Sequence, residues 1–317
     1  MKQRTLTVAA VQMHCEPCEI DRNLAHAESM VEKTAQLGAE LVLLPELTPG
    51  GYILTETIWD VAEPVSGRSV TWLKNTARHL GIYLGMSYLE AEGRDFYNSF
   101  VLATPKGKIA GRVRKNPPAS VEAYFYKAGS DKHVIKTDIG LIGVGICYEN
   151  LLHESLCGLM EASVDLVLQP MSAGRPNPIL PGDTERFDRI LRQGPPHYAG
   201  TLGVPVVMAN KAGQLETDLP GWFPKLKGSF PGLSAIVDSD GSVRASLGEE
   251  EGVIVANVHL DPERKRQEQP QHNGTRWALP VMPWYAFLWP LTQRMGEKAY
   301  AKNSRRAACA KTAASRR

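Results

Sequence analysis

The feature that most constrains the fold is a pattern that occurs once in each half of the chain. A helical segment, in which apolar residues recur every three or four positions, leads into a short apolar run that ends in proline. In the first half the helical segment covers 21–35 and the run covers 40–45. In the second half they cover 151–163 and 165–170. Continuous apolar strands occur where helices cover a sheet or where two sheets stack, so the pattern predicts buried strands in a layered α/β fold.

The rest of the chain alternates further strands and helices with several hairpins. Expected strands cover 6–11, 82–89, 97–103, 108–113, 139–147, 205–210, 234–237, 242–245 and 253–258, and expected helices cover 68–80 and 184–202. A Gly- and Pro-rich loop is expected after residue 210, and Pro105-Lys-Gly107 predicts a hairpin turn. Hairpins mixed with strand–helix units favour two stacked sheets faced by helices. We expect one domain, 1–262, followed by a C-terminal extension, 263–317.

The extension differs in charge from the rest of the chain. The 317 residues carry a formal net charge of +2, but residues 292–317 hold eight Lys or Arg and one Glu. The last segment is therefore +7, which leaves −5 on residues 1–291. We expect the basic segment to be solvated and partly disordered. No recognised nucleic-acid-binding module accompanies it, so no nucleic-acid partner is expected.

An aromatic-rich stretch, 277–289, precedes the basic segment. We expect it to pack on a neighbouring subunit, with an interfacial membrane contact as the alternative. The apolar stretch 277–291 contains three prolines and is too short for a membrane span. The run 6–11 is too short for the core of a signal peptide. The five cysteines are scattered, which favours reduced thiols, so we expect a cytoplasmic protein.

Three strand ends carry residues that suit chemistry rather than packing. Glu46 follows the first apolar run, Lys115 follows the strand 108–113, and Cys147 ends the strand 139–147. Taken singly, each has an ordinary explanation: a capping acid, an exposed basic edge and an inert buried thiol. Together, a carboxylate, an ammonium and a thiol at the ends of buried strands predict one catalytic site at a sheet edge.

Other kinds of site find little support in the sequence. It contains no GxGxxG, Walker or HExxH motif, which argues against nucleotide, phosphate and zinc chemistry. Cys15 and Cys18 have CxxC spacing but no second pair of ligands. We therefore predict no metal site.

The candidate residues and their surroundings resemble the nitrilase superfamily of carbon–nitrogen hydrolases. The resemblance spans residues 5 to about 262 and rests on Gln12-Met13, Asp21, Asn23-Leu24, Leu44-Pro-Glu46, Lys115, Glu122, Gly145-Ile-Cys-Tyr-Glu149 and Gly241. It implies an α-β-β-α sandwich that assembles into homodimers or larger oligomers. It also implies a catalytic triad of Glu46, Lys115 and Cys147 that needs no cofactor, with Glu122 orienting the lysine and the substrate.

The implied roles agree with the chemistry of these groups. An ordinary thiol has a pKa of about 8.5 and is mostly protonated at neutral pH, so Cys147 needs a base. Glu46 takes its proton, later protonates the leaving nitrogen and activates water. Lys115 and the backbone N–H of Tyr148 hold the developing oxyanion. We also expect a helix beginning at Asn150 to direct its N-terminus at Cys147.

The motifs leave the choice between an amide and a nitrile open. Many family amidases have His-Leu after the lysine, whereas Asn116-Pro117-Pro118 is similar to the true-nitrilase branch. Cys147-Tyr-Glu is close to the Cys-Trp-Glu of that branch. Many members have Pro-Glu six and seven residues after the cysteine, and here His153-Glu154 retains only the acid. Amide hydrolysis is the more frequent activity of the superfamily.

We therefore expect a thiol hydrolase of a small-molecule amide, with nitrile hydrolysis and acyl transfer to an amine as enzymatic alternatives. The non-enzymatic alternative is a scaffold that binds a membrane or a partner through the extension. The loops 172–181 and 218–229, with their Pro, Gly and Trp222, predict a partly enclosed pocket of mixed polarity.

Overall fold

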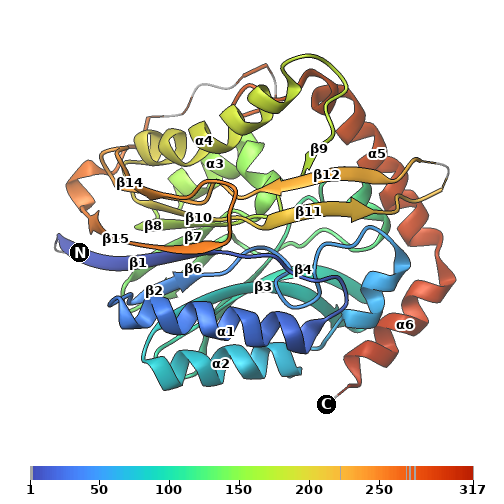
Figure 1. The fold of residues 1–317 in the computed structure, drawn as a ribbon, viewed down its shortest axis with the longest axis horizontal. Helices are drawn as coiled ribbons and strands as arrows, with labels where there is room; N and C mark the ends of the chain where they lie inside the picture. Colours follow the sequence, from blue (N-terminus) through green and yellow to red (C-terminus); the bar gives the residue numbers. More distant parts are fainter. Residues whose placement is uncertain (1–2, 222, 269, 271–272, 275, 317) are drawn as a thin grey trace.

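The computed structural model has two stacked six-stranded sheets with helices on both outer faces (Figure 1). It describes residues 3–221, 223–268, 270, 273–274 and 276–316. Trp222 and Arg317, which belong to the predicted pocket loops and basic segment, lie outside these ranges. The predicted α-β-β-α sandwich is confirmed.

The first sheet combines parallel strands with hairpins. Its order is β15-β1-β2-β3-β4-β5, formed by β1 (Arg4–Gln12), β2 (Leu41–Leu43), β3 (Tyr83–Glu92), β4 (Asp95–Ala103), β5 (Ile109–Arg114) and β15 (Gly252–Leu260). Strands β1, β2 and β3 are parallel because α1 (Ile20–Gln36) and α2 (Arg68–Leu80) connect them. Strands β4 and β5 then pair antiparallel, and the predicted turn at 105–107 separates them.

The second sheet repeats this plan. Its order is β14-β13-β10-β8-β7-β6, formed by β6 (Val134–Thr137), β7 (Gly140–Val144), β8 (Leu166–Pro170), β10 (Val206–Ala209), β13 (Ala235–Val237) and β14 (Val243–Ser246). Strands β7, β8 and β10 are parallel, and α3 (His153–Glu161) and α4 (Asp183–Leu202) cross over between them. The carboxyl ends of these parallel strands carry the loops that build the site.

The apolar runs are continuous because each face of a strand meets a different apolar layer. Leu41 and Leu43 pack between the two sheets, whereas Val42 and Leu44 pack with residues of α1 and α2 on the outer face. Side chains alternate along a strand, so burial on both faces leaves no polar position in the run.

Two local predictions are wrong. The Gly- and Pro-rich loop expected after residue 210 contains β11 (Ala212–Thr217) and β12 (Leu226–Pro231), which form a small third sheet together with β9 (Arg175–Pro176). The helix expected from Asn150 is replaced by a 3-10 turn, η3 (Cys147–Leu151). Leu152 then has extended backbone, so α3 begins only at His153.

The C-terminal extension forms two helices, α5 (Pro283–Lys302) and α6 (Ser304–Ala314), which run along one side of the sandwich (Figure 1). Ala307, Ala310 and Ala313 are buried, and the last two belong to the core between the first sheet and its helices. Arg305 pairs with Glu56 at 2.9 Å. The prediction of a solvated, partly disordered basic segment is therefore wrong.

The charge asymmetry of the chain contributes to this docking. Arg306 of α6 pairs with Asp95 at the start of β4, and the Tyr300 hydroxyl accepts a hydrogen bond from the Phe96 N–H at 2.9 Å. Basic residues of the extension thus neutralise acids of the body. Among the residues that the structure describes, no helix is both long and apolar enough to cross a membrane.

The docking of α6 predicts that Ala310→Asp lowers the free energy of unfolding by about 2–4 kcal/mol, because it buries a carboxylate without a partner. Ala308→Asp on the exposed side of the same helix is the matched control and should change stability by less than about 0.5 kcal/mol. Urea unfolding measures both variants. Equal stability of the two variants would contradict the docking.

Candidate active site

Three of the predicted side chains meet in a buried ionic cluster. Lys115 Nζ lies 2.7 Å from Glu46 Oε1 and 2.8 Å from Glu122 Oε2, and all three side chains are buried. Burial lowers the pKa of Lys115, but the two carboxylates outweigh this effect and raise the pKa well above its ordinary value. Lys115 is therefore an ammonium that bridges two carboxylates.

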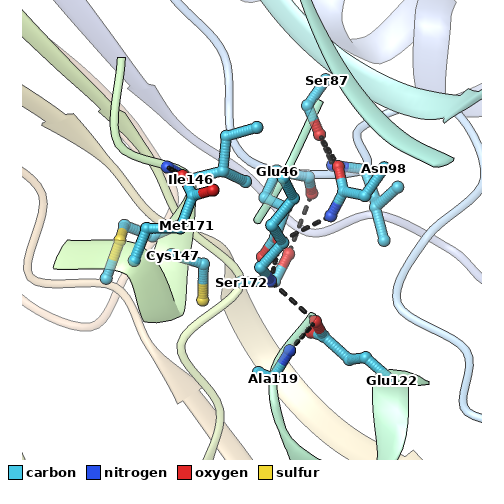
Figure 2. Close-up of polar contacts among 12 residues, drawn as sticks. Glu46, Ser87, Asn98, Ala119, Glu122, Ile146, Cys147, Met171 and Ser172 are labelled. Carbon is cyan, nitrogen blue, oxygen red and sulfur yellow. Dashed lines mark hydrogen bonds and ion pairs between the residues drawn. The ribbon is translucent and has the colours of Figure 1, made fainter. Parts of the chain in front are cut away.

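The position of Glu46 is fixed from both sheets. Its Oε1 accepts a hydrogen bond from Asn98 Nδ2 at 2.7 Å, and Asn98 Oδ1 in turn accepts one from Ser87 Oγ at 3.0 Å (Figure 2). From the second sheet, the Ser172 hydroxyl donates to the Glu46 carbonyl at 2.9 Å, and the Glu46 N–H donates to the Met171 carbonyl. The other carboxylate oxygen, Oε2, is buried and has no hydrogen-bond partner in the part of the chain that the structure describes.

Glu122 lies in the 3-10 helix η2 (Ser120–Tyr124), seven residues after Lys115. Its Oε2 also accepts a hydrogen bond from the Ala119 N–H at 2.7 Å, and its Oε1 accepts one from the Tyr52 hydroxyl at 2.9 Å. Donors at both oxygens satisfy this buried carboxylate and fix the second side of the Lys115 ammonium.

Cys147 occupies a strained turn beyond the end of β7. Its φ is +52°, in the left-handed region that non-glycine residues seldom adopt. Asn150 Nδ2 donates to the carbonyls of Gly145 at 2.7 Å and Cys147 at 3.1 Å, which closes the turn. A Cβ at position 145 would lie 2.1 Å from Asn150 Oδ1, so this approach requires glycine.

Glu149 joins this turn to the end of the lysine strand. Its Oε2 accepts a hydrogen bond from the Ile146 N–H at 2.6 Å, immediately before Cys147. Its Oε1 accepts from the Asn116 N–H, immediately after Lys115, and contacts His133 Nε2 at 2.8 Å. One buried carboxylate thus fixes the thiol and the ammonium relative to each other.

The surroundings of Cys147 keep its thiol protonated in the resting site. Burial, followed by the charge of Glu46, raises its pKa well above the ordinary value, while Lys115 and the backbone N–H of Ser172 oppose the shift. The ionic cluster already has one more carboxylate than ammonium. A second negative charge on sulfur is therefore unfavourable until a proton moves.

Cys147 opens onto a cavity of about 250 Å³. In Figure 2 its side chain extends toward the region that holds the Glu46 and Glu122 carboxylates. Among the described residues that line the cavity, Glu122 alone carries a formal charge, and most of the others are aliphatic or aromatic. The predicted mixed polarity is therefore wrong, because the loops present apolar side chains to the cavity.

The C-terminal extension supplies one wall of this cavity, which sequence analysis did not foresee. The Trp289 ring stacks on Tyr285 with centroids 3.9 Å apart and lies 5.0 Å from the ring of Tyr148. Trp284, Tyr285 and Trp289 of α5 line the cavity. The aromatic stretch, which was expected to pack on a neighbouring subunit, therefore packs against residues of its own chain.

The residues that position these candidate side chains were not predicted from the sequence. Ser87 and Asn98 are polar residues inside apolar strands, and that contrast is the signal that would have identified them. Tyr52 and His133 lie in unpatterned segments and carry no comparable signal. Within the described ranges, no group of three or more His, Cys, Asp or Glu residues is placed to hold a metal ion.

The contact between His133 and Glu149 predicts a pH-dependent contribution to stability. Burial lowers the pKa of His133, but Glu149 and the Asp131 backbone outweigh it and raise the pKa above its ordinary value. A raised histidine pKa stabilises the fold fully below the unfolded-state value, and the contribution fades as the pH rises through the folded-state value. The Tm difference between wild type and His133→Asn should therefore be larger at pH 5.5 than at pH 9. A difference that grows with pH would contradict this assignment.

Comparisons with known proteins match most of the chain. The family model described as carbon-nitrogen hydrolase matches residues 7–266. An N-carbamoylputrescine amidase of Solanum lycopersicum is 29% identical over 272 residues, which are 82% of this chain and 88% of the relative. A probable nitrilase of Schizosaccharomyces pombe is 30% identical over 261 residues, covering 80% of this chain and 89% of the relative. The crystal structure of a carbon-nitrogen hydrolase from Helicobacter pylori superposes with a TM-score of 0.73 at 20% identity, covering 82% of this chain and 91% of the other.

Proposed function

The chain belongs to the carbon–nitrogen hydrolases of the nitrilase superfamily, and we propose that it hydrolyses a small amide through a thioester on Cys147. The observation that carries this proposal is the unsatisfied Oε2 of Glu46. Asn98 and Lys115 both bind Oε1, so Oε2 is the oxygen left to accept a proton. The neutral thiol of Cys147 needs a base. The buried Oε2 of Glu46 has no donor among the described residues and can accept the thiol proton.

In the first step, the Cys147 sulfur forms a bond to the amide carbon while its proton moves to Glu46 Oε2. The carbonyl π electrons move to oxygen, which becomes an oxyanion. The Lys115 ammonium and the Tyr148 backbone N–H stabilise this oxyanion. The net charge of the site does not change, because the negative charge leaves Glu46 as it forms on the substrate oxygen.

In the second step, the oxyanion collapses, the carbon–nitrogen bond breaks, and Glu46 returns the proton to the leaving nitrogen. Ammonia or an amine departs and a thioester remains on Cys147. Water then attacks the thioester carbon and gives a proton to Glu46. Collapse of that intermediate releases the carboxylic acid, and the proton returns to the Cys147 sulfur.

Nitrile hydrolysis is the second candidate, which the Asn116-Pro117-Pro118 motif and the similarity to a probable nitrilase support. It uses the same nucleophile and consumes two waters. In acyl transfer, an amine attacks the thioester carbon in place of water. The homodimer or larger oligomer and the cytoplasmic location remain predictions.

The experiment that tests the proposal measures ammonia release from a panel of amides, nitriles and carbamoyl compounds. Cys147→Ala should lower turnover by at least about 10,000-fold, because it removes the nucleophile of the covalent route. Cys157→Ala, which removes a half-buried cysteine outside the cavity, is the matched control and should keep wild-type activity. Added hydroxylamine reveals acyl transfer as a hydroxamate product.

Mass spectrometry with a slowly turned-over amide should show an acyl adduct on Cys147 in the wild type. Ammonia release at the wild-type rate by Cys147→Ala would overturn the mechanism. Activity on nitriles alone would be consistent with the thioester route but would favour nitrile hydrolysis over amide hydrolysis.

A further inference from the structure

Most of the described residues that line the cavity are apolar, and Glu122 alone among them carries a charge. The apolar ones include Phe187 and Leu191 of α4, Leu215 and Leu226 of the small third sheet, and Leu288 and Trp289 of α5. The described lining residues include no Lys, Arg or His. An acyl group with a carboxylate or an ammonium would lose its hydration here without gaining an ionic partner.

Four hydroxyl groups of residues that line the cavity already have partners within the chain. Tyr52 donates to Glu122, and Ser172 donates to the Glu46 carbonyl. The hydroxyls of Ser120 and Thr292 hydrogen-bond to each other at 2.7 Å. Because these hydroxyl groups are hydrogen-bonded within the chain, they are less available to bind a ligand.

Two buried neutral groups that belong to residues lining the cavity, the Trp284 Nε1–H and the Tyr148 hydroxyl, make no hydrogen bond to the described residues. Neither supplies a full charge that could pair with a carboxylate or an ammonium on a substrate. They point to the same conclusion as the apolar wall.

The charges near Cys147 also disfavour an anionic acyl group. Glu46, Lys115 and Glu122 together carry one net negative charge in a buried position. A carboxylate on the acyl group would add a second negative charge close to that cluster. An ammonium would be attracted to it, but Glu122 is the one acid among the described lining residues, and its oxygens already bind Lys115, Tyr52 and the Ala119 N–H.

We propose that the substrate is a carboxamide whose acyl group is uncharged and apolar, either an alkyl chain or an aryl-alkyl group, and that α5 sets this preference. The inference rests on the proposed function of Cys147. The cavity of about 250 Å³ has room for a medium-length acyl group. Helix α5 begins after the family match ends at residue 266, so the wall that it supplies is a feature of this chain's extension.

The first test measures binding without catalysis. Hexanamide, the equally long adipamate with a terminal carboxylate, and 6-aminohexanamide are titrated into Cys147→Ala, with quenching of Trp284 and Trp289 fluorescence as the readout. Hexanamide should bind at least about 100-fold more tightly than either charged compound, because a desolvated charge without a partner is strongly unfavourable. Across butyramide, pentanamide and hexanamide, affinity should rise about fourfold per methylene.

The second test inverts the preference through α5. Leu288 lines the cavity and is half exposed, so Leu288→Arg introduces a cation at the wall without disturbing the core. It should raise the ratio of kcat/KM for adipamate to that for hexanamide by at least about tenfold. Leu291→Arg, equally exposed on the same helix but outside the lining, is the matched control and should leave the ratio within about twofold.

The outcomes separate this inference from the proposed function. Equal or tighter binding of the charged compounds, or binding of none of the three, overturns the apolar preference. Cys147-dependent ammonia release from a charged amide with a kcat/KM equal to or above that for hexanamide would do the same and leave the proposed function intact. Selective binding of hexanamide by Cys147→Ala, with no turnover of any amide or nitrile by the wild type, would support the inference and refute the proposed hydrolysis.

Discussion

The arrangement of the site depends on one interaction, the Lys115 ammonium held between the carboxylates of Glu46 and Glu122. Three charges with no exposure to solvent are unfavourable unless each is paired and hydrogen-bonded, and removing one partner of such a group costs about 3–5 kcal/mol. Asn98, Tyr52 and the Ala119 N–H supply the further donors. One oxygen of Glu46 has no hydrogen-bond partner among the described residues, and Glu46 is the residue that we propose moves a proton.

The two sheets contribute different parts of the chemistry, and a few contacts hold those parts in register. The first sheet carries the acid–ammonium cluster, and the second carries the strained turn with the thiol. Glu149 joins the two by binding the N–H groups beside Cys147 and beside Lys115. The extension contributes as well, because α5 packs against Tyr148, the residue after Cys147, and lines the cavity.

Much of the fold was predictable because burial on both faces leaves a plain signal, as in the run 41–44, and because glycine marks turns such as 105–107. The triad candidates were predictable because charged or nucleophilic residues directly follow such strands, and the structure brings Glu46 and Lys115 into contact. The path of the extension was not predictable, since the alanines of α6 show no strong apolar pattern and its arginines find partners far away in sequence. The apolar cavity was also missed, because residues from α4, the small third sheet and α5 meet only in the folded chain.

The central claim is that Cys147 rests as a neutral thiol and that Glu46 takes its proton during attack. Thiolate absorbance near 240 nm, measured against pH as the difference between each protein and its Cys147→Ala counterpart, tests it most directly. The wild type should show no thiolate at neutral pH. Glu46→Gln should show thiolate at lower pH, because a negative charge that raises the pKa of Cys147 is gone, and yet amide turnover should fall by about 100- to 10,000-fold. A thiolate in the resting wild type, or full turnover by Glu46→Gln, would contradict the account.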